Sequence, residues 1–232
     1  MKKRRLLAVT LVLALVLGSV ALPAGAAFQD AKGHWAQEAI ERWEGRGVVK
    51  GDEKGFRPDD PMTRAEFAVV LDRLMAYAET KVNPFKDVPA GTWYTKSVLG
   101  AAAAGILLGT DVDKASPGDR ITREQAFTLM GRALMVKENE AGTAAYSDAA
   151  EISKYAKGYI GGMTAAGILH GSNGKCSPKS NITRAEVITV VDNAIGDIVD
   201  KAGEYQKDSE KSVIVNAAGA VLKDMAVKGN LI

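Results

Sequence analysis

The chain has 232 residues, of which 47% are hydrophobic and 25% charged, so it is long enough to bury a core of its own. Its formal net charge is +2, and four of the positive charges lie at positions 2–5. Without those four the net charge is −2 (2 − 4) and no basic stripe is left, which argues against nucleic acid as a partner.

The N-terminal segment has the order of a signal peptide. The basic residues at positions 2–5 precede an apolar run from Leu6 to about Leu22, and the small residues Ala24-Gly25-Ala26 follow it. We expect residues 1–26 to be a signal peptide that is cleaved after Ala26, which makes the protein secreted. An uncleaved anchor helix is the alternative, although the run is barely long enough to span a bilayer. After cleavage we expect no contact with the membrane.

Three copies of one set of motifs follow, in residues 27–79, 80–140 and 141–196. The first copy opens with Phe28-Gln29-Asp30. A helix is expected next, with Trp35, Ala39, Ile40 and Trp43 on one apolar face. A Gly-rich loop leads to a second helix that starts at Thr63. The other two copies repeat this order, so we expect an all-α array of three helix-loop-helix units that share one core.

The C-terminal segment, residues 197–232, has a different character. It begins as a charged stretch without a clear repeat, and β-branched residues then alternate with turn-forming ones. We therefore interpret it as a linker and the first rung of a β-rich segment. Because the sequence stops in the apolar pair Leu231-Ile232, our hypothesis is that the chain is truncated or short compared with its relatives.

The second helix of each copy begins with a capping box. Thr63 precedes Glu66 by three residues, and Thr122 with Gln125 and Thr183 with Glu186 repeat the pattern. In such a box the Thr hydroxyl accepts from a backbone N–H and the acid or amide bonds back to the Thr N–H. Helix capping is therefore a sufficient reason for these side chains.

The Arg in the first turn of each second helix has no such local reason. Arg64, Arg123 and Arg184 are spaced by 59 and 61 residues, and a positive charge at this place opposes the helix dipole. A carboxylate-bearing ligand would offset the penalty, helped by free helix N–H groups. An internal pair with the repeated Asp is the alternative, and the sequence leaves both open. We expect Arg64→Ala together with Arg184→Ala to leave folding largely intact, because the capping boxes do not use the Arg.

The remaining repeated residues have a structural and a binding interpretation each. The repeated aspartates are Asp30, Asp87 and Asp148. The aromatics after them, Trp35, Trp93 and Tyr155, would be core residues or walls against a sugar ring. The glycines after each first helix, Gly51, Gly109 and Gly171, fit helix ends or turns, or the close approach of a ligand.

The sequence contains no recognisable catalytic or metal-binding motif. His34 and His170 have no ligands at metal spacing, and the stretch after Asp111 fails as a calcium loop. Cys176 is the single cysteine, so no internal disulfide is expected. We expect no cofactor, no metal and no enzymatic activity in this chain.

The motifs together resemble the S-layer homology (SLH) domain. Phe-x-Asp, a Trp-containing helix, Gly-Ile/Val-x-x-Gly, Gly-x-Phe-x-Pro and Ile-Thr-Arg-Ala-Glu occur in the family's order over residues 28–195, as three modules. The resemblance implies a pseudo-threefold, three-pronged helical domain built within one chain. It also implies non-covalent attachment to the secondary cell-wall polysaccharide of bacteria, often a polymer with a pyruvate ketal. The grooves between prongs would bind the sugar, with the motif Arg as a main contact.

The chain departs from the family pattern in four places. Tyr155 replaces a Trp, and Glu124-Gln125 replaces Ala-Glu. Met62 stands in place of the usual apolar residue before the Thr of the first copy, and the third copy has no counterpart of Phe56. We therefore expect unequal grooves, with those of Arg64 and Arg184 preferred over that of Arg123.

Two other functions remain as alternatives to cell-wall anchoring. The chain could be the anchoring part of a surface enzyme that acts on glycans, with the catalytic part in or beyond the C-terminal segment. It could also belong to a self-assembling envelope protein of the S-layer, which would need a large assembly domain.

Overall fold

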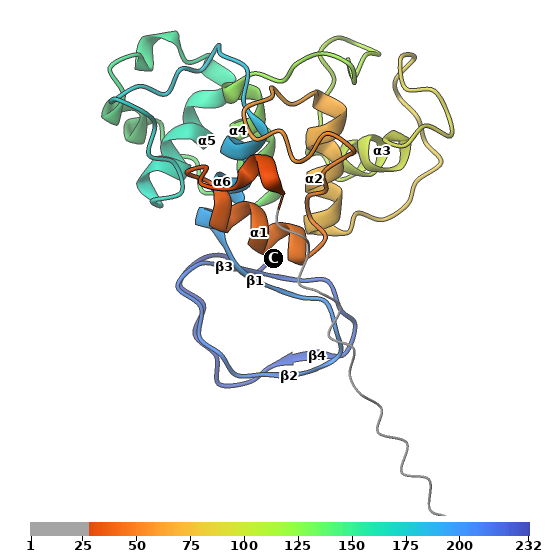
Figure 1. Ribbon diagram of the computed structural model, residues 1–232, viewed down its shortest axis with the longest axis vertical. Helices are drawn as coiled ribbons and strands as arrows, with labels where there is room; N and C mark the ends of the chain where they lie inside the picture. The colour runs from red at the N-terminus through yellow and green to blue at the C-terminus, as the bar shows by residue number, and fades with distance from the viewer. Residues whose placement is uncertain (1–27) are drawn as a thin grey trace, which may run out of the picture.

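The computed structural model describes residues 28–232, so the predicted signal peptide lies outside the described residues. The expected all-α array is confirmed: three prongs of helices surround a common core, above a small coil of strands (Figure 1). The helices are α1 (Gln37–Gly45), α2 (Arg64–Met75), α3 (Thr95–Ala103), α4 (Arg123–Ala133), α5 (Lys154–Ala165) and α6 (Arg184–Ala194). Short 3₁₀ helices lie at Gln29–Ala31, Glu140–Ala145 and Ala149–Glu151.

All three predicted capping boxes form. The Thr63 hydroxyl accepts from the backbone N–H of Glu66 at 3.2 Å, and the Glu66 carboxylate accepts from the Thr63 N–H at 2.7 Å. The same reciprocal bonds start α4 and α6. Each second helix therefore begins at the residue that local sequence chemistry selects.

A triangle of backbone hydrogen bonds closes the array at its centre. The N–H of Met62 donates to Ile182, that of Ile182 donates to Ile121, and that of Ile121 donates back to Met62, at 3.0–3.1 Å. All three side chains are buried. Because each repeat supplies one donor and one acceptor, the assembly is a closed ring rather than an open stack.

The helices pack between repeats. Each prong pairs the second helix of one repeat with the first helix of the next: α2 with α3, α4 with α5, and α6 with α1. The pairing of α6 with α1 joins the two ends of the array. The Trp43 indole of α1 donates to Asp192 of α6 at 2.9 Å, and buried aliphatic and aromatic side chains of all three repeats form one cluster.

The C-terminal segment forms the expected short strands and is also packed against the helices. β1 (Ile195–Val199) pairs in parallel with β3 (Ser212–Val215), and β2 (Gly203–Tyr205) with β4 (Ala220–Leu222). The chain therefore winds as a coil of about two turns below the helices (Figure 1). We expected part of this segment to be a linker, but Ile198, Ile214 and Ile232 pack into or against the helical core.

Side chains of the coil satisfy carbonyls at the ends of the three second helices. The Asn216 amide donates to Leu74 at the end of α2, and the Asn230 amide donates to Leu134 at the end of α4, both at 2.8 Å. The Lys211 ammonium donates to the backbone carbonyl of Asp192, near the end of α6, at 2.6 Å. These last carbonyls have no partner within their own helix, which explains why a polar coil docks there. Within residues 28–232, no helix has the length and apolarity needed to cross a bilayer.

Candidate functional site

The three motif arginines link each repeat to the next one. The Arg64 Nε donates to the carbonyl of Ala115 at 2.8 Å, and the Arg123 Nε to that of Cys176 at 2.7 Å. Arg184 completes the ring with a bond of 2.7 Å to the carbonyl of Phe56, 128 residues away. Burial lowers the pKa of Arg64 and of Arg184, but a guanidinium remains charged at neutral pH.

This geometry revises two expectations from the sequence. The arginines bond one repeat to the next, and Arg64 and Arg184 are buried, so we now expect alanine at these positions to lower stability. The first N–H groups of the second helices are also not free to bind an anion. The N–H groups of Arg184 and Ala185, for example, donate to carbonyls of the first repeat at 3.0 and 2.9 Å, and the equivalent groups of the other two helices are bonded in the same way.

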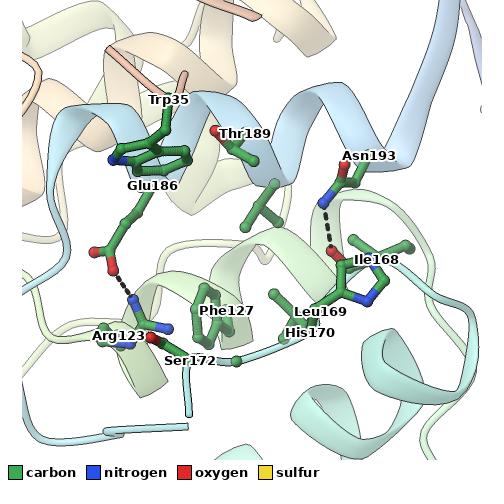
Figure 2. A pocket seen from close by; sticks show the side chains of 12 residues that line it. Trp35, Arg123, Phe127, Ile168, Leu169, His170, Ser172, Glu186, Thr189 and Asn193 are labelled. Carbon is green, nitrogen blue, oxygen red and sulfur yellow. Dashed lines mark hydrogen bonds and ion pairs between the residues drawn. The ribbon is translucent and has the colours of Figure 1, made fainter. Parts of the chain in front are cut away.

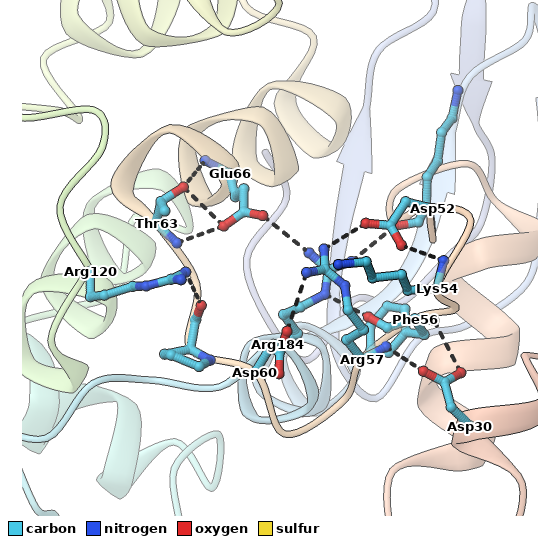
Figure 3. Close-up of polar contacts among 12 residues, drawn as sticks. Asp30, Asp52, Lys54, Phe56, Arg57, Asp60, Thr63, Glu66, Arg120 and Arg184 are labelled. Atoms are coloured by element: carbon cyan, nitrogen blue, oxygen red, sulfur yellow. Dashed lines mark hydrogen bonds and ion pairs between the residues drawn. The ribbon is translucent and has the colours of Figure 1, made fainter.

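The remaining guanidinium contacts differ between the arginines. Arg123 forms an ion pair with the capping-box residue of the next repeat, Glu186 (Figure 2). Arg184 lies 3.7 Å from Glu66 and donates to the carbonyl of Lys50 at 2.9 Å (Figure 3). The residue facing Arg64 is the neutral Gln125, and within residues 28–232 the Nε bond is the one hydrogen bond of the Arg64 side chain.

The repeated aspartates hold loops, and within residues 28–232 they form no ion pair with the motif arginines, so the alternative of an internal Asp–Arg pair is wrong. Asp30 accepts from the backbone N–H groups of Phe56 and Arg57 at 3.0 and 2.6 Å (Figure 3). Asp87 and Asp148 make the same two bonds in their own repeats. Burial alone would raise the pKa of Asp30 and of Asp148, but these bonds outweigh it and lower both pKa values.

Each of these loops presents the carbonyl that receives an arginine. The residue after that carbonyl is left-handed in all three copies, with φ of 51–56° at Arg57, Ser116 and Ser177. Non-glycine residues rarely adopt this left-handed conformation. The two bonds to the aspartate offset its cost. The aspartates therefore position the loops and line none of the three grooves described below.

The aromatic residues are exposed rather than buried in the core. Trp35 and Trp93 expose 64% and 66% of their surface, and Tyr155 exposes half. Trp35 precedes α1 instead of lying on its apolar face, because the helix begins only at Gln37. The core-aromatic alternative is therefore wrong for all three positions, and the alternative of an aromatic wall stays open.

Three grooves run between the prongs, and each is lined by residues from all three repeats. We name them by their arginine. The Arg123 groove, of about 430 Å³, combines Arg123 with Trp35 and Gly171 (Figure 2). The Arg184 groove, of about 380 Å³, combines Arg184 with Trp93 and Gly51. The Arg64 groove, of about 340 Å³, combines Arg64 with Tyr155 and Gly109.

The groove glycines are needed because the backbone is crowded there. A Cβ atom on Gly109 would lie 2.6 Å from the carbonyl of Lys114 and 3.2 Å from the ring of Phe85, and Gly51 and Gly171 are similarly enclosed. Of the alternatives left open by the sequence, a place at the end of the first helix is wrong for these glycines. That place belongs to Gly47, Gly105 and Gly167, whose φ values are 70–72°.

One contact was missed by the sequence analysis. The Glu124 carboxylate accepts from the Tyr155 hydroxyl at 3.0 Å, from Lys179 at 2.6 Å, and from the N–H and hydroxyl of Ser153 at 2.9 Å. Burial would raise the pKa of Glu124, but these bonds lower it. Burial, and then Glu124, raise the pKa of Tyr155 to about 12. The sequence held one signal for this contact, since Glu124 and Tyr155 both depart from the residues found at their positions in the other repeats.

Comparisons with known proteins agree with this arrangement. The family model described as the S-layer homology domain matches residues 27–68, 84–127 and 145–188. The chain is 35% identical to an amylopullulanase of Thermoanaerobacterium thermosulfurigenes, over 71% of the chain and 9% of that protein. It is 31% identical to the surface-layer 125 kDa protein of Lysinibacillus sphaericus, over 85% and 17% respectively. With the S-layer protein sap of Bacillus anthracis it shares 28% identity, over 95% of the chain and 28% of the relative. The chain thus spans less than a third of the length of these relatives.

Proposed function

The chain belongs to the S-layer homology domain family, whose members anchor surface proteins to the cell wall, and we propose that it does so by binding an anionic secondary cell-wall polysaccharide in its three grooves. The attachment would be non-covalent. The observation that carries this proposal is the threefold repetition of an exposed aromatic ring beside a guanidinium in a groove. Nothing in the fold itself requires a large ring to face solvent at the same place three times.

The chemistry of each groove suits an acidic glycan. A sugar ring has an apolar face that stacks on an aromatic side chain, and its hydroxyl groups pair with backbone and side-chain polar atoms. A guanidinium recognises a carboxylate through paired N–H donors. A polymer that carries a pyruvate ketal offers both features, since the ketal places a carboxylate directly on a sugar.

We assign the chain an anchoring role rather than a catalytic one. The amylopullulanase is matched over 9% of its length, and S-layer proteins match the same modules. The feature common to these relatives is therefore the module and not the glycan-degrading part. The proposed location is the cell wall, with the three repeats of one chain forming the binding unit.

A sedimentation assay with purified cell-wall sacculi tests this function. Residues 27–232 are mixed with native sacculi and with sacculi stripped of secondary polymer by hydrofluoric acid. We expect the protein to sediment with native sacculi alone. The double variant Trp35→Ala/Trp93→Ala should stay largely in solution, because stacking of a ring against an aromatic contributes on the order of 1 kcal/mol per site.

The matched control is Val112→Ala, a change at a fully exposed apolar residue outside the grooves. It should bind as well as the parent chain, and all variants should melt at the same temperature, since the altered side chains are exposed. Equal sedimentation with stripped sacculi, or binding by the double variant at the parent level, would contradict the proposed function.

A further inference from the structure

Two of the four departures from the repeat pattern meet in one groove. In the sequence, Glu124 and Gln125 lie in the second repeat and Tyr155 lies in the third. In the structure, Gln125 and Tyr155 both line the Arg64 groove, and Glu124 holds the Tyr155 hydroxyl. These changes in two repeats therefore alter the Arg64 groove, whereas Met62 lines the Arg184 groove and the carbonyl of Cys176 accepts from Arg123.

The first consequence concerns the charge of Arg64. In the other grooves the capping-box residue is a glutamate, which lies near the guanidinium of Arg123 or Arg184. Gln125 performs the same capping with its side-chain oxygen, which accepts from the Thr122 N–H at 3.1 Å, but carries no charge. Within residues 28–232, the terminal nitrogens of Arg64 have no hydrogen-bond partner although the residue is 96% buried. A buried cation with spare donors favours an anionic ligand.

The groove linings differ in whether they contain a carboxylate. The described lining of the Arg64 groove contains two cations, Arg64 and Arg132, and no carboxylate. The Arg123 groove contains Glu186, and the Arg184 groove contains two carboxylates beside four cations, which gives its lining the same net charge of +2 as that of the Arg64 groove. A carboxylate ligand would therefore meet a lining carboxylate in the other two grooves but not in the Arg64 groove, where Asp119 and Asp87 act on Arg64 from outside the lining.

The second consequence concerns the aromatic wall. Glu124 does not line the groove, because its carboxylate is buried behind it and is occupied by Lys179 and Ser153. Its remaining bond fixes the hydroxyl of Tyr155, while half of the Tyr155 surface stays exposed. The groove thus gains an oriented ring without gaining a negative charge of its own.

We propose that the Arg64 groove is the site at which this chain takes the carboxylate-bearing sugar of its glycan, with Gln125 as the residue that determines the preference. This assignment rests on the proposed function. The other two grooves would then hold uncharged sugar units through Trp35 and Trp93. Glu124 acts as a positioning residue for Tyr155.

The substitution Gln125→Glu tests the assignment with little risk to folding, because a glutamate caps the other two helices in the same place. Binding of the purified protein to wall polymer is measured by calorimetry, with native polymer and with polymer whose carboxyl groups have been reduced to alcohols. We expect Gln125→Glu to weaken binding of native polymer at least about tenfold, since the new carboxylate occupies the donors of Arg64. Binding of reduced polymer should be weaker and the same for both proteins.

Glu186→Gln is the matched control, since it makes the reverse change in the Arg123 groove. It should leave binding of native polymer unchanged or strengthen it. Equal affinity of the parent and Gln125→Glu for native polymer would overturn the groove assignment, and equal affinity of the parent for native and reduced polymer would overturn the carboxylate preference. Absence of any binding by the parent chain would instead refute the proposed function itself.

Discussion

Replacing Arg184 by alanine should open the ring of repeats at the contact between its two ends. The Arg184 side chain is nearly buried and donates to the carbonyls of Phe56 and Lys50 at 2.7 and 2.9 Å. Its guanidinium also lies over the Phe56 ring, 4.8 Å from the centroid. Alanine removes all three contacts and leaves the two carbonyls without this donor.

The expected loss follows from these contacts. A hydrogen bond to a charged group contributes about 1.5–3 kcal/mol net, so two such bonds amount to roughly 3–5 kcal/mol when water replaces part of the loss. For a domain of this size each kcal/mol lowers the melting temperature by about 2–4 °C. We therefore expect a decrease of roughly 10 °C.

Thermal unfolding followed by circular dichroism measures this decrease, and Arg42→Ala is its matched control. Arg42 also joins the first and third repeats, through Asp192 at 2.7 Å, but half of its side chain is exposed. Such an exposed pair contributes about 1 kcal/mol or less, so the control should melt within a few degrees of the parent. If Arg184→Ala is no less stable than Arg42→Ala, the structural role of the motif arginine is refuted.

Three further predictions concern the groove glycines, the buried carboxylate and the C-terminal coil. Gly171→Ala should lower the free energy of unfolding in urea by about 1–3 kcal/mol, because the φ of Gly171 is +67° and a Cβ would lie 2.5 Å from a carbonyl oxygen. Gly118→Ala is the control and should be near neutral, since a Cβ there would have no atom within 4 Å. Equal effects of the two changes would contradict the crowding argument. The pKa of Glu124 is lower in the folded protein, so this residue contributes stability that is present above its usual pKa near 4.5 and is lost as the pH falls through the lower folded value. The urea midpoint should therefore decrease below about pH 4.5, and less steeply in Glu124→Gln. Identical slopes for the two proteins would show that Glu124 does not contribute to the acid sensitivity. Asn230→Ala should speed amide exchange in the last turn of α4, with a loss of about 1 kcal/mol, whereas unchanged protection there would show that the coil does not stabilise that helix end.

The fold could be predicted largely from local signals. The helix starts at Thr63, Thr122 and Thr183 follow from capping chemistry, which needs no residue outside one turn. The short strands after Ile195 follow from the run of β-branched residues between turns. The docking of those strands could not be predicted, since it depends on the ends of helices from other repeats, such as Leu74, which lies 142 residues before Asn216.

The repeated sequence by itself determined that three similar units exist, where their second helices begin and which arginines, aromatics and glycines recur. Only the tertiary structure decided which of these residues meet. The arginine of each repeat bonds to a carbonyl of the next repeat, and each prong combines helices of two repeats. A groove therefore combines residues from all three units. An alignment of one unit with another does not show which of these residues meet. The same closure buried the arginines, exposed the rings of Trp35 and Trp93, and joined Glu124 to Tyr155, since burial and partners depend on packing across the ring rather than on spacing along the chain.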